Sequence, residues 1–305
     1  MEDLNLRPMT LGEVLDRTFR LYKSNFWLFI GVTALPYLLI LLFQIGVAAM
    51  ASSFGQGSQP PNVTPGFIGR IFTGFSIGFV FYLIIYGYTL AATIFAVSDV
   101  YLARTATVRG SFAKVGAKIL RIMLIFFFIL IAAIVAIIVV GIVAGILGAI
   151  TRSAPLIFVL FIVCGLAAVI LFCRLALWIP AAMLENVGAG NSFQRSMYLT
   201  EGYALQFFLI YLLVGVLTYA AILVFQAPFF AIAGRAAASH QALPFGIAVL
   251  QDLGAFMSQV LVGPIGTIAT SLMYYNLRVR KEAFDIQHLM SSLQATATPG
   301  PAATT

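Results

Sequence analysis

Six long apolar runs, almost free of charged residues, restrict this chain to a fold that crosses a membrane. Only one run contains a charged residue, Arg174. Each is close to or longer than the roughly 20 residues that a helix needs to cross the hydrocarbon of a bilayer. The runs also lack the alternation of barrel strands, and lipid offers no partner for unpaired backbone groups. We therefore predict an all-α, polytopic membrane helical bundle with spans at about 26–50, 71–97, 122–150, 155–177, 207–231 and 253–277.

The distribution of basic residues predicts the orientation of these spans. Charged residues make up only 9% of the 305 residues, against about 25% in an ordinary soluble domain. The net charge of +7 is therefore interpreted as an orientation signal, and we expect no nucleic-acid partner. If both termini and the second and fourth connections lie on one side, that side, together with Arg174 near the end of the fourth run, holds 14 of the 17 Lys and Arg residues. We predict a multi-pass protein of the bacterial cytoplasmic (inner) membrane with both termini cytoplasmic, a single membrane domain at 1–289 and a disordered tail at 290–305.

An amphipathic segment that begins at Thr10 leads directly into the first span. Its apolar residues recur at the three- and four-residue spacing of one helix face, and Thr10 with Glu13 predicts a capping box. Segments that begin at Ser111 and Ser192 have the same arrangement before the third and fifth spans. We predict interfacial helices on the cytoplasmic side and three tandem units, each with an interfacial helix, a span and a returning span. The alternative is the topology that any six-span protein would show.

The basic residues of the first two amphipathic segments are candidates for contact with anionic lipid headgroups. Each Lys or Arg near an anionic membrane surface adds about 1 kcal/mol of attraction. We expect membrane lipids as partners, with a membrane-protein partner or a second copy of the chain as further possibilities. The predicted headgroup contacts are Arg17, Arg20, Lys23, Lys114, Lys118 and Arg121.

The sequence contains no pattern that predicts catalysis, a cofactor or a metal site. The residues at 74–78 match the GxSxG nucleophile motif, but they lie within a span, where Gly74 and Gly78 are better interpreted as helix-packing residues. An intramembrane serine protease of the rhomboid kind would need a His at membrane depth. His240 and His288 lie outside the spans on opposite predicted sides, which also argues against a two-His metal site. We expect no enzyme activity, no cofactor and no metal.

Two further groups of glycines carry structural predictions. Gly141 and Gly145 in the third span have the four-residue spacing of a helix-contact face. In the last span, Gly263 and Pro264 predict either a broken helix that exposes carbonyls to a substrate or a plain kink whose carbonyls find neighbouring partners.

A few charged residues lie near the predicted ends of spans. Asp99, Arg174 and Glu185 all fall on the predicted cytoplasmic side, where we expect them to pair and to fix the returning spans. No span carries several acids near its middle, so a proton-coupled relay has little support.

Three segments resemble the membrane domain family that accompanies some bacterial glycerophosphoryl diester phosphodiesterases. They read LRPMTLGEVLDRTFRLYKSNFWLFIGV, ENVGAGNSFQRSMYLTEGYALQFF and MYYNLRVRKEAFDIQHL, and the likeness runs from Leu6 to Leu289. In fused relatives a separate barrel-shaped domain performs hydrolysis with acids, His and a divalent metal. Fewer than thirty residues follow the last predicted span here, against about 250 for such a barrel. The resemblance therefore implies a membrane domain only and carries no catalytic residue.

The favoured function is that of a non-enzymatic integral membrane protein, either lipid-interacting or an accessory or scaffold membrane domain. The alternative is a transporter or lipid-handling channel, which requires a polar cavity that reaches the middle of the membrane. An intramembrane hydrolase ranks last, because the spans lack clusters of His, Cys and acids.

Overall fold

The structure, a computed structural model, describes residues 7–54, 65–151, 154–185, 187–239 and 244–283. Within these ranges the regular elements are all helices, which confirms the all-α prediction. Six helices are long and apolar enough to cross a membrane, as predicted. The predicted tail at 290–305, His240 and His288 lie outside the described residues.

The predicted spans fall within long helices, with one correction. The long helices are α2 (Phe26–Phe54), α3 (Pro65–Tyr101), α5 (Ile119–Thr151), α6 (Ala154–Arg174), α9 (Ala204–Ala238) and α10 (Phe245–Glu282). The short ones are α1 (Leu11–Ser24), α4 (Val108–Val115), the 3₁₀ turn η1 (Gly116–Lys118), α7 (Trp178–Leu184) and α8 (Ala189–Leu199). The fourth predicted span, at about 155–177, lies within an apolar stretch from Pro155 to Leu184, but α6 ends at Arg174 and a separate helix follows. Pro180 explains the break: its ring is tolerated in the first turn of α7 but would clash inside a continuous helix.

The order of the elements repeats three times along the chain. The units are α1–α2–α3, α4–α5–α6 and α8–α9–α10, each with an interfacial helix, an outgoing helix and a returning helix. Each interfacial helix packs against the end of the preceding unit: α4 against α3, α8 against α7, and α1 against α10. Because the first unit packs on the last, the three units form a closed ring.

The caps of the interfacial helices correct the predicted alignment of the repeats. Thr10 caps α1 with the predicted capping box, in which its hydroxyl accepts from the Glu13 N–H and the Glu13 carboxylate accepts from the Thr10 N–H. Ser111 and Ser192 are not caps, because they lie buried inside α4 and α8 and donate to the carbonyls of residues one turn earlier. The equivalent N-caps are Thr107 and Gly188. A Ser hydroxyl can serve either position, so the residue type alone does not separate them.

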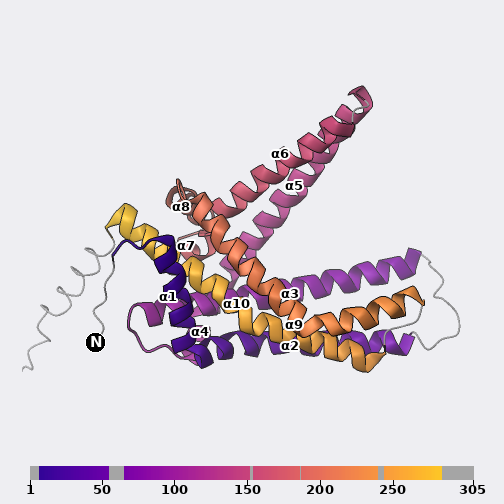
Figure 1. Cartoon of the computed structure of the whole chain (residues 1–305), viewed down its shortest axis with the longest axis horizontal. Helices are drawn as coiled ribbons and strands as arrows, with labels where there is room; N and C mark the ends of the chain where they lie inside the picture. Colours follow the sequence, from indigo (N-terminus) through magenta and orange to yellow (C-terminus); the bar gives the residue numbers. More distant parts are fainter. Residues whose placement is uncertain (1–6, 55–64, 152–153, 186, 240–243, 284–305) are drawn as a thin grey trace, which may run out of the picture.

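The long helices meet at one end and diverge towards the other. Figure 1 shows α1, α4, α7 and α8 gathered where the three hairpins meet, a region that we call the base. The α5–α6 hairpin points away from α2, α3, α9 and α10. The stretch of α10 from Thr267 to Leu277 is buried on all sides, and α10 contacts α7 as well as helices of the first and third units. The base and α10 therefore hold the hairpins together.

Helix α10 continues through Pro264, so the broken helix is wrong and the plain kink is the form observed. A proline removes the N–H that would bond the carbonyl four residues earlier, here that of Val260. The Thr33 hydroxyl lies 3.4 Å from this carbonyl oxygen, and the Tyr22 hydroxyl donates to the next carbonyl, that of Leu261, at 2.8 Å. Burial raises the pKa of Tyr22, which keeps this donor protonated. Neighbouring helices α1 and α2 therefore bring hydroxyl groups to the segment before Pro264.

The predicted glycine contacts are only partly observed. A Cβ added at Gly78 would lie 3.3 Å from the Phe43 ring of α2, so this glycine does face a helix. Gly74, Gly141 and Gly145 have open space where a Cβ would be, and their predicted helix contacts are wrong within this chain. The reason for the last two is the divergence of the α5–α6 hairpin, which leaves most of α5 exposed.

A close backbone approach between two long helices occurs at a glycine outside the predicted packing residues. A Cβ on Gly254 of α10 would lie 2.6 Å from the carbonyl oxygen of Phe225 in α9. We predict that Gly254→Ala lowers the free energy of unfolding by about 1–3 kcal/mol through overpacking. Thermal unfolding in detergent measures this loss. Gly246→Ala in the same helix is the control, since open space surrounds it; equal stability of the two variants would contradict the prediction.

Candidate functional site

Ion pairs at the base join two of the interfacial helices to the units that precede them. Lys114 of α4 contacts Asp99 of α3 at 2.5 Å, and Arg195 of α8 contacts Glu185 at the end of α7 at 2.7 Å. Both basic residues lie seven positions after their helix N-cap. Arg17 holds the same position in α1, where its guanidinium lies 4.8 Å from the centre of the Tyr101 ring. One repeated position of the interfacial helix therefore supplies a cation to two junctions of the ring and, in α1, a cation that lies over an aromatic ring of its own unit.

Arg195 is the centre of a larger polar network. Its guanidinium contacts both Glu185 and Glu282, and Glu282 also accepts from Arg278 at 3.1 Å. The Tyr274 hydroxyl donates to Glu185 at 2.7 Å. Burial lowers the pKa of Arg195, but the hydrogen bonds that its guanidinium donates to the two carboxylates outweigh this effect and raise it overall. The guanidinium is therefore always charged, and the network locks α8 onto α7 and α10.

The predicted pairing among Asp99, Arg174 and Glu185 is wrong. Both acids pair with an interfacial helix, as described above, and Arg174 donates to the Met197 carbonyl of α8 at 3.2 Å. The physical reason is that each residue ends a helix on which the next interfacial helix packs, so the nearest partner comes from that helix.

Four of the six predicted headgroup contacts are engaged within the protein. Lys114 and Arg17 have the partners given above. Lys118 donates to the Met183 carbonyl at 3.0 Å and Arg121 to the Ala182 carbonyl at 2.7 Å, so both cap the last turn of α7. Burial, followed by the charge of Arg121, lowers the pKa of Lys118. These four residues therefore have partners within the protein, and their contact with headgroups stays a prediction. Arg20 and Lys23 are exposed on α1, as a lipid contact requires.

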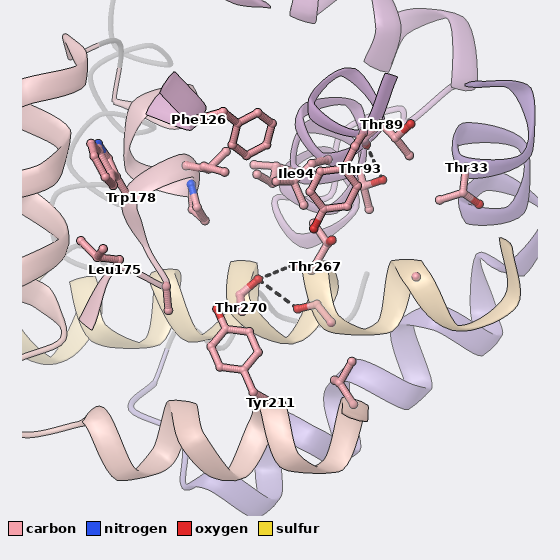
Figure 2. A pocket seen from close by; sticks show the side chains of 18 of the residues that line it. Thr33, Thr89, Thr93, Ile94, Phe126, Leu175, Trp178, Tyr211, Thr267 and Thr270 are labelled. Atoms are coloured by element: carbon pink, nitrogen blue, oxygen red, sulfur yellow. Dashed lines mark hydrogen bonds between the residues drawn. The ribbon is translucent and has the colours of Figure 1, made fainter. Parts of the chain in front are cut away.

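A cavity of about 540 Å³ lies in the fork between the α5–α6 hairpin and the other long helices. Figure 2 shows side chains from α2, α3, α5, α9, α10 and the α6–α7 segment around it. The lining of α10 extends from Gln259 to Thr270, across the midpoint of that helix. Its volume falls in the range of about 300–1,000 Å³ that is usual for small-molecule sites.

Hydroxyl groups give the cavity a partly polar wall at the depth of the spans. Most of the threonines donate to a carbonyl of their own helix, for example Thr89 to Ile85 at 2.8 Å and Thr93 to Thr89 at 2.8 Å. Thr270 likewise donates to Gly266 at 3.0 Å, as the dashed lines in Figure 2 show. These bonds use the hydroxyl protons and leave oxygen lone pairs facing the cavity.

Among the residues of this wall, only Gly263 was predicted from the sequence to matter, as part of a broken or kinked helix. A usable pattern was nevertheless present. Tyr86, Thr89 and Thr93 follow one another at spacings of three and four residues in α3. Gln259, Gly263, Gly266 and Thr270 do the same in α10. A polar or small stripe on one face of an otherwise apolar span marks a surface turned away from lipid.

The described residues contain no cluster of three or more His, Cys, Asp or Glu that could hold a metal ion. Comparison with protein-family models, with curated protein sequences and with solved structures gave no match. The resemblance to the phosphodiesterase membrane domain therefore stays a prediction.

The Arg195 network generates a testable prediction. Arg195→Gln leaves the carboxylates of Glu185 and Glu282 without the cation of α8, and we expect a loss of about 3 kcal/mol in unfolding free energy near neutral pH. Part of this loss should be recovered on acidification, because protonation removes the repulsion between the two acids. Thermal unfolding across pH 5–8 measures both effects, with exposed Arg20→Gln as the control. A loss that does not change with pH would contradict the assignment.

Proposed function

We propose that this chain is a non-enzymatic membrane protein that holds a lipid in the cavity between its hairpins. The observation that carries the proposal is the cavity itself: it lies between the spans, reaches the middle of α10, is lined in part by hydroxyls and is built from all three units. A midmembrane polar cavity is what the lipid-handling alternative requires, whereas a purely structural bundle has no need of one.

The divergence of the α5–α6 hairpin supports lateral access from the bilayer. Phe126 and Ile129 of α5 and Phe172 of α6 line the cavity, and both helices expose apolar side chains along most of their length. A lipid could therefore move from the surrounding bilayer into the fork without passing its chains through water. No part of this route requires a covalent step.

We further propose that the base faces the cytoplasm of a bacterial inner membrane. The unequal distribution of Lys and Arg supports this orientation. Arg20 and Lys23 of α1, together with Arg104 and Arg109 near α4, are exposed there. These residues suit contact with anionic headgroups, and they would fix the depth of the base while the cavity receives its ligand.

Filling the cavity should prevent lipid retention. Gly263 faces the cavity, and only the Gln259 amide oxygen comes within 4.0 Å of a Cβ built there. Gly263→Leu should therefore fold normally and occupy the cavity. We expect purified Gly263→Leu to retain less tightly bound lipid than the unchanged protein, measured by mass spectrometry after mild detergent exchange.

Gly141→Leu is the matched control for that experiment, because it adds the same side chain to an open face of α5. It should retain lipid at the original level. Equal retention by both variants and by the unchanged protein would show that the tightly bound lipid does not use the cavity.

The headgroup proposal has its own test. Replacing Arg20 and Lys23 by Gln removes two exposed charges, each adding about 1 kcal/mol of attraction to an anionic surface. We expect less anionic lipid to co-purify, with the difference disappearing at high salt. Substituting Ser24 and Gly12, which are exposed and uncharged positions of α1, by Gln is the control. An unchanged anionic fraction would rule out this contact.

A further inference from the structure

Among the described residues, the wall of the cavity carries no Asp, Glu, Lys, Arg or His. An ionised phosphate removed from water is strongly disfavoured unless cations pair with it. The basic residues nearest to the α7 side of the cavity, Lys118 and Arg121, direct their donors to the Met183 and Ala182 carbonyls. The site therefore offers a charged headgroup no compensation.

Three hydroxyl groups in the same wall remain available as donors. Those of Tyr86, Tyr211 and Thr267 form no hydrogen bond with any residue in the described part of the chain. They come from α3, α9 and α10, and the ring of Tyr211 projects from α9 towards Thr270 in Figure 2. Unpaired hydroxyls at this depth can donate to a carbonyl, ester or hydroxyl oxygen of a ligand.

The remaining polar groups of the wall are mainly acceptors. Thr33, Thr89, Thr93 and Thr218 give their protons to carbonyls of their own helices, at 2.8 Å in each case. Their oxygens can still accept from a ligand hydroxyl. The wall therefore matches a neutral group that both donates and accepts, surrounded by apolar side chains that suit a hydrocarbon chain.

From this combination we infer that the ligand is an uncharged lipid whose polar end carries ester or hydroxyl oxygens, such as a diacylglycerol, and not a phospholipid with its phosphate in the cavity. The inference rests on the proposed function, since it specifies the ligand class of the same site. The polar end lies among Tyr86, Tyr211 and Thr267, and the chains leave through the fork along α5 and α6.

The test uses the full chain in detergent micelles and a diacylglycerol with a photoactivatable acyl chain. Unlabelled diacylglycerol, a long-chain prenyl alcohol and phosphatidic acid with the same acyl chains compete for labelling, and mass spectrometry locates the label. We expect label in α5 and α6 near Phe126, Ile129 and Phe172, along which the chains leave the cavity, with stronger competition by diacylglycerol than by phosphatidic acid. Competition by the prenyl alcohol as well would show that a hydroxyl alone is enough; its absence would assign recognition to the esters.

Variants of the phenols connect the preference to named groups. Tyr86→Phe and Tyr211→Phe should each weaken diacylglycerol competition about fivefold, the factor for one lost neutral hydrogen bond, and leave phosphatidic acid unchanged. Tyr219→Phe is the control, because Tyr219 lies on α9 but is 64% exposed and outside the cavity. None of these phenols holds a structural hydrogen bond among the described residues, so folding should be unaffected; the melting temperature checks this.

The possible outcomes separate the two proposals. Label in the cavity helices with equal or stronger competition by phosphatidic acid would overturn the inferred ligand class and leave the proposed function intact. If Tyr86→Phe and Tyr211→Phe both keep the preference for diacylglycerol, these phenols do not recognise the polar end of the lipid. Absence of label from the cavity helices with every lipid would overturn the proposed function itself.

Discussion

The side-chain amide of Asn276 in α10 binds the backbone of Met9, just before α1. The arrangement of the helices depends on that contact. The amide oxygen accepts from the Met9 N–H at 2.7 Å, and the amide nitrogen donates to the Met9 carbonyl at 3.0 Å. Arg280 donates to the same carbonyl at 2.8 Å. Both Met9 and Asn276 are buried, and a buried backbone group without a partner costs about 1–3 kcal/mol. This contact therefore fixes α1 on α10 and closes the ring of three units.

Polar contacts at the base explain how a cavity can persist among the hairpins. Lipid chains are as apolar as Leu or Ile, so apolar helices gain little by packing against one another within a bilayer. Lys114 with Asp99 and Arg195 with Glu185 instead hold the units together at the base. The hairpins above are free to diverge, and α5 and α6 do so. A fork lined by hydroxyls is the geometric consequence.

The sequence predicted what depends on neighbours along the chain and missed what depends on distant pairs. The spans and the Thr10–Glu13 capping box were predictable because length, hydropathy and three-residue spacing determine them. The partner of Asp99 was not predictable. In the predicted topology Arg174 and Glu185 lay on the same side of the membrane as Asp99, and no local pattern distinguished Lys114 as its partner. Asn276 and Met9 are separated by 267 positions, and no local pattern connects them. The cavity combines side chains from many helices. The sequence could therefore predict only the polar or small faces of single helices and not their assembly into one wall.

The kink at Pro264 connects the membrane surface with the cavity. Tyr22 of α1 donates to the Leu261 carbonyl within the kinked segment, and Thr33, which lines the cavity, approaches the carbonyl of Val260. Helix α1 also presents Arg20 and Lys23 on its exposed face. One short helix thus carries the surface charges on one side and, on the other, a phenol that bonds to α10 next to Pro264. Since Gly263 and Gly266 flank that kink and line the cavity, the position of α1 and the shape of the cavity are determined by the same contacts.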